Sequence, residues 1–196
     1  MILCIGAYAS ETEPTDTGRV VAQLVTSHDQ VKVGQSFYVA LVTDMDPEWH
    51  IYWKNPGDSG EPVDIYWGES PLVDVGDIIW PLPDTIPTGP IVNYGFEGRV
   101  IFPMPVTAPA DLNIGDVVPL DASITYLVCK DICIPEMAEL SVAVTIGEPA
   151  LDDRWSYNID TAISEAPIQT DTNAKVTLKG TEISFEFETD LSLIHI

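Results

Sequence analysis

The sequence predicts an all-β fold, an antiparallel β-sandwich, and three observations support this class. Short runs of alternating apolar residues recur at intervals of about 8–12 residues, which is typical of sandwich strands. Sixteen Pro and 13 Gly are spread along the 196 residues and supply turns between these runs. Hydrophobic residues make up 45% of the chain and include five Trp, so the chain can bury a proper core.

The strands of the sandwich are expected between residues 18 and 144, where β-branched and aromatic residues are concentrated. A turn is expected at residues 28–30, and residues 54–60 are almost entirely turn-forming. The prolines between residues 81 and 90 exclude a central strand there. The predicted strands span residues 18–25, 37–43, 49–53, 63–67, 78–80, 99–102, 117–128 and 138–144.

A different pattern begins at residue 147 and predicts a short helix followed by a hairpin. Apolar residues at a spacing of four form one face of the helix, and Pro167 ends it. Two alternating segments on either side of Lys179-Gly180 then predict a hairpin. Too few residues remain for a domain, so we interpret residues 149–196 as a helical linker and the start of a truncated second β domain. The residues of the helix face are Leu151, Trp155, Ile159 and Ile163.

Charge and the N-terminal residues bear on the compartment. The chain has 31 acidic and 8 basic residues, a net charge of -23, which disfavours binding to nucleic acid or to an anionic membrane surface. Residues 1–9 are apolar and end in Ala-Tyr-Ala, so we predict a partial signal peptide and an exported protein. Cleavage would remove Cys4 and leave one pair of cysteines. No apolar run reaches the roughly 18 residues of a membrane span, so we expect this segment to be soluble.

Cys129 and Cys133 are the residues that best indicate a function. The alternating segments around them predict a hairpin with a three-residue loop, which places the two cysteines opposite each other. Facing residues of an antiparallel pair have Cα atoms about 4.5–5.5 Å apart, near the lower end of disulfide geometry. The two thiols can therefore form a disulfide with little movement of the backbone.

Three uses of this pair are open: redox exchange, a structural disulfide and zinc binding. A cross-link over so short a loop restricts the unfolded chain by only about 2 kcal/mol, so redox exchange is the favoured interpretation. Structural zinc sites have four ligands. The remaining candidate ligands, which show no ligand spacing to one another, are Cys4, His28, His50 and His195. We therefore predict neither a metal nor another cofactor.

The neighbours of the pair suggest how its reactivity is controlled. Lys130 would favour a thiolate, whereas Asp131 opposes that effect. Residues 93–98 are too Gly-rich for a regular strand and form a candidate lid, the alternative being an aromatic loop packed on the core. His50 is interpreted as an ordinary surface or half-buried histidine. The aromatic residues interpreted as packing the sandwich are Trp49, Tyr52 and Trp53.

Three segments, taken together and in this order, resemble a known family. They are residues 49–60 (WHIYWKNPGDSG), 89–98 (GPIVNYGFEG) and 126–136 (YLVCKDICIPE). They resemble the N-terminal periplasmic domain of the DsbD/ScsB group of membrane thiol:disulfide interchange proteins, and the ScsB-like branch is the more similar. The resemblance covers approximately residues 17–146.

The resemblance implies an immunoglobulin-like antiparallel β-sandwich over residues 17–148 that carries the redox pair on a hairpin. It implies a protein-disulfide reductase in which a thioredoxin-like domain of the same full-length protein passes electrons to this domain. This domain would then reduce periplasmic thioredoxin-fold oxidoreductases. Cys133 would form the mixed disulfide with a partner, and Cys129 would resolve it. An aromatic cap loop shields the pair in the family, which implies Tyr94 and Phe96 here, with Asn93 where the DsbD branch has its cap Phe.

Two other functions stay open from the sequence. One is an immunoglobulin-like binding module whose disulfide is structural. The other is copper handling, because the ScsB branch is linked with copper tolerance and two thiols can hold Cu(I).

Overall fold

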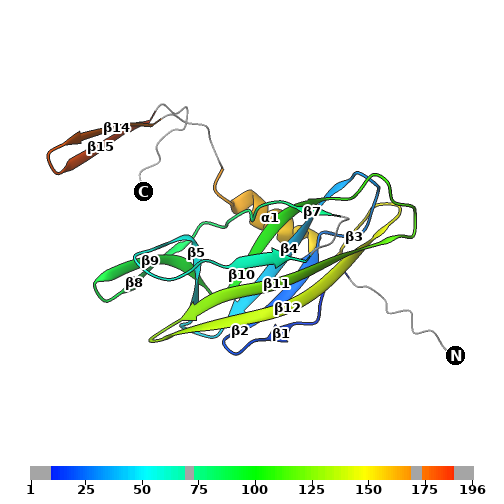
Figure 1. Ribbon diagram of the computed structural model, residues 1–196, viewed down its shortest axis with the longest axis horizontal. Coiled ribbons are helices and arrows are strands. Elements are labelled where there is room, and N and C mark those ends of the chain that lie inside the picture. The colour runs from blue at the N-terminus through cyan, green and yellow to red at the C-terminus, as the bar shows by residue number, and fades with distance from the viewer. Residues whose placement is uncertain (1–9, 69–72, 169–173, 188–196) are drawn as a thin grey trace. The chain divides into compact units, whose positions relative to one another are not determined.

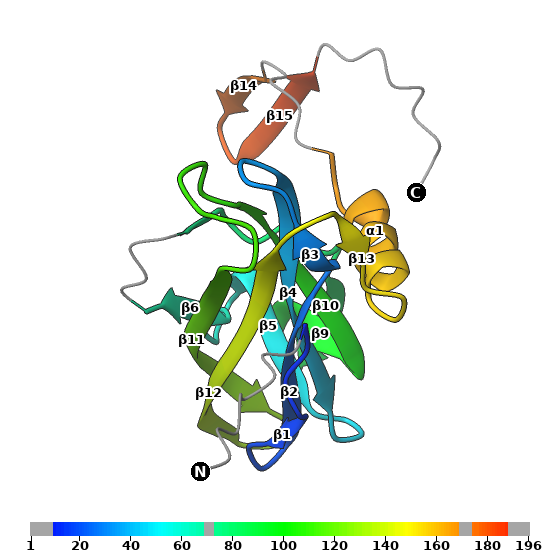
Figure 2. The same ribbon diagram turned by 90° about the vertical axis from the view of Figure 1, so that its right-hand side faces the viewer.

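The computed structural model of the chain describes residues 10–68, 73–168 and 174–187, and Figures 1 and 2 label its elements. The chain divides into two compact units, Met1–Ala166 and Pro167–Ile196. The predicted signal segment, residues 1–9, lies outside the described residues. In the part of the chain that is described, no helix combines the length and the apolar character needed to cross a membrane.

The first unit is a sandwich of two sheets, which confirms the predicted all-β, immunoglobulin-like class. The five-stranded sheet has the order β1 (Thr15–Asp16), β2 (Val20–Thr26), β4 (Ser36–Met45), β10 (Arg99–Thr107) and β7 (Asp74–Val75). The eight-stranded sheet has the order β13 (Ala150–Leu151), β3 (His28–Val31), β12 (Cys133–Ile146), β11 (Val117–Cys129), β5 (His50–Gly57), β9 (Ile91–Glu97) and β8 (Asp84–Thr88), with β6 (Asp64–Trp67) also paired to β11. The described strand pairs are antiparallel except β12 with β3.

The apolar core lies between the two sheets. Along β11, every second side chain from Val118 to Val128 is buried, as the period of a strand with one core face requires. The opposite sheet contributes Leu24, Leu41 and Phe102, each fully buried in the same cluster. A shift of β11 by one residue would turn its apolar side chains out of this core, so the core fixes the register of the β11–β12 hairpin.

Two segments differ from the expected pattern because of backbone chemistry. Residues 93–98, predicted to be too Gly-rich for a strand, lie mostly in β9. A Cβ at Gly95 would lie 2.2 Å from the carbonyl oxygen of Ile51, so glycine permits this close pairing. The predicted strand at residues 78–80 is absent from the described strands. On the neighbouring β10, the carbonyl oxygens of Pro103 and Pro105 accept one hydrogen bond each, from the amides of Ile79 and Gly76. Neither proline has an N–H to donate in return, which prevents a full ladder of strand hydrogen bonds here. The turn predicted at residues 28–30 is instead part of β3.

The helix α1 (Ser156–Glu165) covers the outer face of the five-stranded sheet (Figure 2). Ile159 is fully buried against Val25, Ala40 and Val42, which point away from the main core. Leu151, predicted on the helix face, instead lies in β13 and is 57% exposed. The sandwich unit therefore includes this helix and extends past residue 148, the domain boundary expected from the sequence.

The second unit contains one hairpin in its described residues. β14 (Ala174–Lys179) pairs antiparallel with β15 (Glu182–Phe187), and Gly180 in the turn has φ +66°, a conformation that favours glycine. A two-stranded hairpin is marginally stable alone in water.

Candidate functional site

The two cysteines form a disulfide at the tip of the β11–β12 hairpin. This tip of the hairpin lies at one end of the sandwich (Figure 1). Cys129 and Cys133 face each other in the register, and their Cα atoms are 4.1 Å apart. The amide of Lys130 donates a hydrogen bond of 3.1 Å to the carbonyl oxygen of Ile132 and closes the three-residue loop. The predicted hairpin and the predicted pairing are both confirmed.

The two sulfur-bearing residues differ in exposure. Cys129 is 2% exposed, because it lies between β12 and the neighbouring strand β5, whereas Cys133 is exposed at the hairpin tip. Ile132, next to Cys133 in the chain, is 64% exposed, and Met137, further along β12, is 59% exposed. Another thiolate can therefore approach Cys133 but not Cys129.

Strand β5 supplies two polar side chains that the sequence did not single out as functional. His50 faces Cys129 in the register and is 4% exposed. Tyr52, two residues further on the same face, places its hydroxyl 3.8 Å from Cys133 Sγ and 3.4 Å from His50 Nε2. The imidazole and phenol rings meet edge to face, with centroids 5.2 Å apart. The side chains around the disulfide are therefore an aromatic hydroxyl and an imidazole.

Burial alters the acid–base behaviour of both side chains. Burial lowers the pKa of His50 below its usual 6.5, and the nearby Glu97 carboxylate only partly opposes this. Burial raises the pKa of Tyr52, and a hydrogen bond with Ser59 works against this rise. At neutral pH the site therefore holds a neutral imidazole and a neutral phenol.

A loop after β5 covers Tyr52. Gly60 has φ +98°, and a Cβ there would lie 2.3 Å from the Tyr52 ring, so glycine lets the backbone rest on the ring. Asn93 is 2% exposed and its Oδ1 accepts hydrogen bonds from the amide and the hydroxyl of Ser59, at 3.0 and 3.2 Å. The loop thus fixes the Tyr52 ring beside the disulfide.

The predicted cap residues lie elsewhere on β9. Phe96 is 4% exposed and packs edge to face on Phe102 in the main core, with centroids 5.4 Å apart. Tyr94 is 37% exposed and lies against Trp53, with centroids 6.5 Å apart. Because Tyr94 and Phe96 alternate with Glu97, they point away from the face of the sheet that carries His50. The structure therefore does not bring them to the disulfide.

Lys130, the cation expected to favour a thiolate, is engaged elsewhere. Its ammonium group forms an ion pair with Glu48. The hydrogen bond from Lys130 lowers the pKa of Glu48, and the same bond raises the pKa of Lys130. The positive charge at the loop is therefore largely balanced by a carboxylate.

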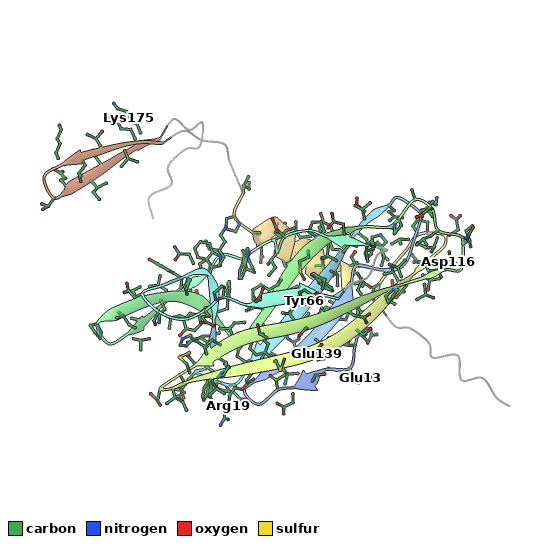
Figure 3. All side chains as sticks on the ribbon, in the orientation of Figure 1. Glu13, Arg19, Tyr66, Asp116, Glu139 and Lys175 are labelled. Atoms are coloured by element: carbon green, nitrogen blue, oxygen red, sulfur yellow. A yellow bond between two sulfur atoms is a disulfide. The ribbon has the colours of Figure 1, made fainter. Side chains whose placement is uncertain are left out.

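Glu136 on β12, close to the tip of the redox hairpin, holds the hairpin against the turn between β1 and β2. Its carboxylate accepts hydrogen bonds from the Arg19 amide at 2.9 Å and from the Thr17 hydroxyl at 2.6 Å. Thr17 Oγ1 also lies 2.6 Å from the hydroxyl of Tyr126, whose pKa burial raises to about 12. Figure 3 labels Arg19, which lies beside this end of β12. These contacts fix the hairpin relative to the rest of the sandwich.

The described residues offer no cluster of three or more His, Cys, Asp or Glu side chains that could hold a metal ion. His50 and the two cysteines are adjacent, but in this structure the sulfurs are bonded to each other. A disulfide lacks the thiolates that bind Cu(I) or zinc. The chemistry that this arrangement supports directly is thiol–disulfide exchange.

Comparison with known proteins agrees with this chemistry. The sequence model of the family described as "Thiol:disulfide interchange protein DsbD, N-terminal" matches residues 22–145. Among solved structures, the chain is similar to the N-terminal periplasmic domain of ScsB from Proteus mirabilis, with a TM-score of 0.68 and 16% sequence identity over 93% of this chain and 70% of that one. At that identity the likeness shows the fold. A search of curated proteins gave no match.

Proposed function

This chain belongs to the family of DsbD N-terminal domains, and from that premise we propose that it relays electrons between proteins through the Cys129–Cys133 pair. The family establishes a thiol:disulfide interchange domain of a larger protein. The observation that carries the relay is the unequal exposure of the two cysteines, with Cys133 at the surface and Cys129 buried behind it. Attack on an exposed sulfur and resolution by a shielded one is what a relay requires.

The relay runs in two half-reactions, each consisting of an attack and a resolution. A reduced thioredoxin-like domain of the full-length protein attacks Cys133 with its thiolate, breaks the Cys129–Cys133 bond and releases the Cys129 thiolate. The second thiol of that domain then resolves the mixed disulfide and leaves both cysteines of this domain reduced. The reduced Cys133 thiolate next attacks the disulfide of a periplasmic thioredoxin-fold oxidoreductase. Cys129 resolves that mixed disulfide, so the oxidoreductase leaves reduced.

We also propose a location and partners for this domain. We place this domain in the periplasm, because the first nine residues predict export and because the similar domain of ScsB is periplasmic. We expect it to act as a protein-disulfide reductase domain. The exposed Ile132 next to Cys133 and the exposed Met137 further along β12 offer apolar contacts for a thioredoxin-fold partner. Of the expected linker at residues 149–196, the helix packs on the sandwich, and residues 167–196 are proposed to begin a second β domain with the β14–β15 hairpin. A cap formed by Tyr94 and Phe96 stays a prediction. In the described structure it is the hydroxyl of Tyr52 that contacts the disulfide.

Two measurements test the relay. The reduction potential of the Cys129–Cys133 disulfide, from equilibration with glutathione, is expected between about −180 and −270 mV, the range of exchange-active proteins. The Cys129→Ser variant is expected to accumulate a mixed disulfide with a thioredoxin-fold partner through Cys133, and Cys133→Ser to form none. A potential below about −300 mV would instead identify a structural disulfide and favour a binding module.

A further inference from the structure

Cys129 belongs to a row of facing residues that crosses four neighbouring strands of the larger sheet. Cys133 on β12 faces Cys129 on β11, Cys129 faces His50 on β5, and His50 faces Glu97 on β9. Facing residues of antiparallel strands point to the same side of the sheet, with Cβ atoms about 4.5–5.5 Å apart. The row therefore places a thiol, an imidazole and a carboxylate side by side.

We propose that His50 is the general base that removes the proton of Cys129 when Cys129 resolves a mixed disulfide, and that Glu97 stabilises the imidazolium that forms. This inference rests on the proposed relay function. A thiol attacks as its thiolate, and a thiol with the ordinary pKa of about 8.5 is only about 3% ionised at pH 7. A nucleophile beside a base that a third group orients is a recurring solution to this problem.

The surroundings of His50 suit a proton acceptor. Its burial lowers the pKa of His50, so at neutral pH the imidazole is in the neutral form that accepts a proton. Lys130, the nearest cation of the hairpin loop, is paired with Glu48. The titratable groups that face His50 are Cys129 on β11, Glu97 on β9 and Tyr52 on its own strand, with Cys133 beyond Cys129 on β12.

The step balances without another reactant. In the mixed disulfide, Cys133 Sγ is bonded to the partner sulfur, and Cys129 is a thiol. The Cys129 proton moves to His50, the Cys129 sulfur attacks Cys133 Sγ, and the partner sulfur leaves as a thiolate with the electron pair of the broken bond. The imidazolium, which faces the Glu97 carboxylate, then returns its proton to solvent.

The test uses the reduced domain and glutathione disulfide as the probe. Rapid mixing, acid quenching and mass spectrometry follow the glutathione adduct on Cys133 as it forms and decays. In the unaltered chain, the decay rate is expected to rise with pH to a midpoint below 6.5 and then to level off, because His50 is then neutral. In His50→Gln, adduct formation is expected within about twofold of normal. Its decay is expected to be at least about tenfold slower at pH 7 and to rise steadily toward pH 8.5.

Two further variants separate proton transfer from a structural effect. His28→Gln is the matched control, because His28 on β3 also has its pKa lowered by burial and faces β13 rather than the cysteines. It is expected to leave both rates unchanged. Glu97→Gln changes an exposed side chain, and it is expected to slow the decay and move its midpoint to lower pH, since Glu97 raises the pKa of His50.

The outcomes distinguish this inference from the relay itself. If the unaltered chain forms and resolves the adduct, but His50→Gln resolves it at the normal rate with the same pH profile, His50 is not the base. If His50→Gln does not fold, the profile of the unaltered chain decides: a decay rate that climbs steadily through pH 6.5 without levelling off overturns the proposal. If the unaltered chain forms no adduct with glutathione disulfide, the proposed relay fails instead.

Discussion

Replacing Glu136 by alanine tests how firmly the sandwich holds the redox hairpin. The Glu136 carboxylate accepts one hydrogen bond from the Arg19 amide and one from the Thr17 hydroxyl. Hydrogen bonds to charged groups contribute about 1.5–3 kcal/mol each. Glu136 is only half-buried, so the lower value applies, and two bonds give about 3 kcal/mol. Water replaces part of the lost bonding, so we expect the free energy of unfolding to fall by about 2 kcal/mol.

Urea denaturation followed by tryptophan fluorescence measures this change, and the slope against urea concentration should stay the same because the fold is retained. A loss of that size would lower the melting temperature by about 4–8 °C in a protein of this length. Glu139→Ala is the control: Glu139 lies on the same strand and accepts one exposed hydrogen bond from Ser123. Its loss should cost less than about 0.5 kcal/mol. Equal destabilisation by the two variants would refute the reasoning.

Two other predictions concern the helix and the histidines. Ile159→Ala removes a fully buried side chain from the cluster under α1 and should weaken helix docking by about 2–5 kcal/mol. Hydrogen exchange should then quicken in α1 but not in β11, and equal quickening in both would contradict a local effect. Burial lowers the pKa of His28 and of His50 below 6.5 in the folded protein, so the unfolded chain binds more protons as the pH falls. Stability should therefore decrease from pH 7.5 to pH 5.5, and the double variant with Gln at both positions should lose most of that slope.

The redox hairpin could be predicted from sequence because everything that defines it is local. The alternation on both sides of the loop sets the register, and the three-residue spacing then places Cys129 opposite Cys133. The burial of Cys129 and the exposure of Cys133 depend on β5, a strand that is distant from the hairpin in the sequence. The family resemblance implies the roles of the two cysteines but not this difference in their exposure.

The neighbours of the disulfide could not be found from sequence, because alternation does not reveal strand order. The spacing of His50 and Tyr52 shows that both point to one side of a strand. Only the pairing of β5 with β11 shows that this is the side that carries Cys129. Gly95 explains why the sequence did not predict a strand at residues 93–98. Glycine disfavours strands on average, but here the missing Cβ lets β9 approach the backbone at Ile51.

The outer strands of the two sheets limit how this domain can recruit a partner. The five-stranded sheet ends in β1 and β7, and the larger sheet ends in β13 at one side, each with two residues. At the other side, β8 contains Pro87, which offers no N–H to an incoming strand. Such edges are poor templates for strand addition, a common mode of peptide capture and also the first step of sheet aggregation. These outer strands therefore offer little to a partner, whereas residues 133–144 of β12 pair only with β11 among the described strands and leave one backbone edge open along the hairpin that carries the disulfide.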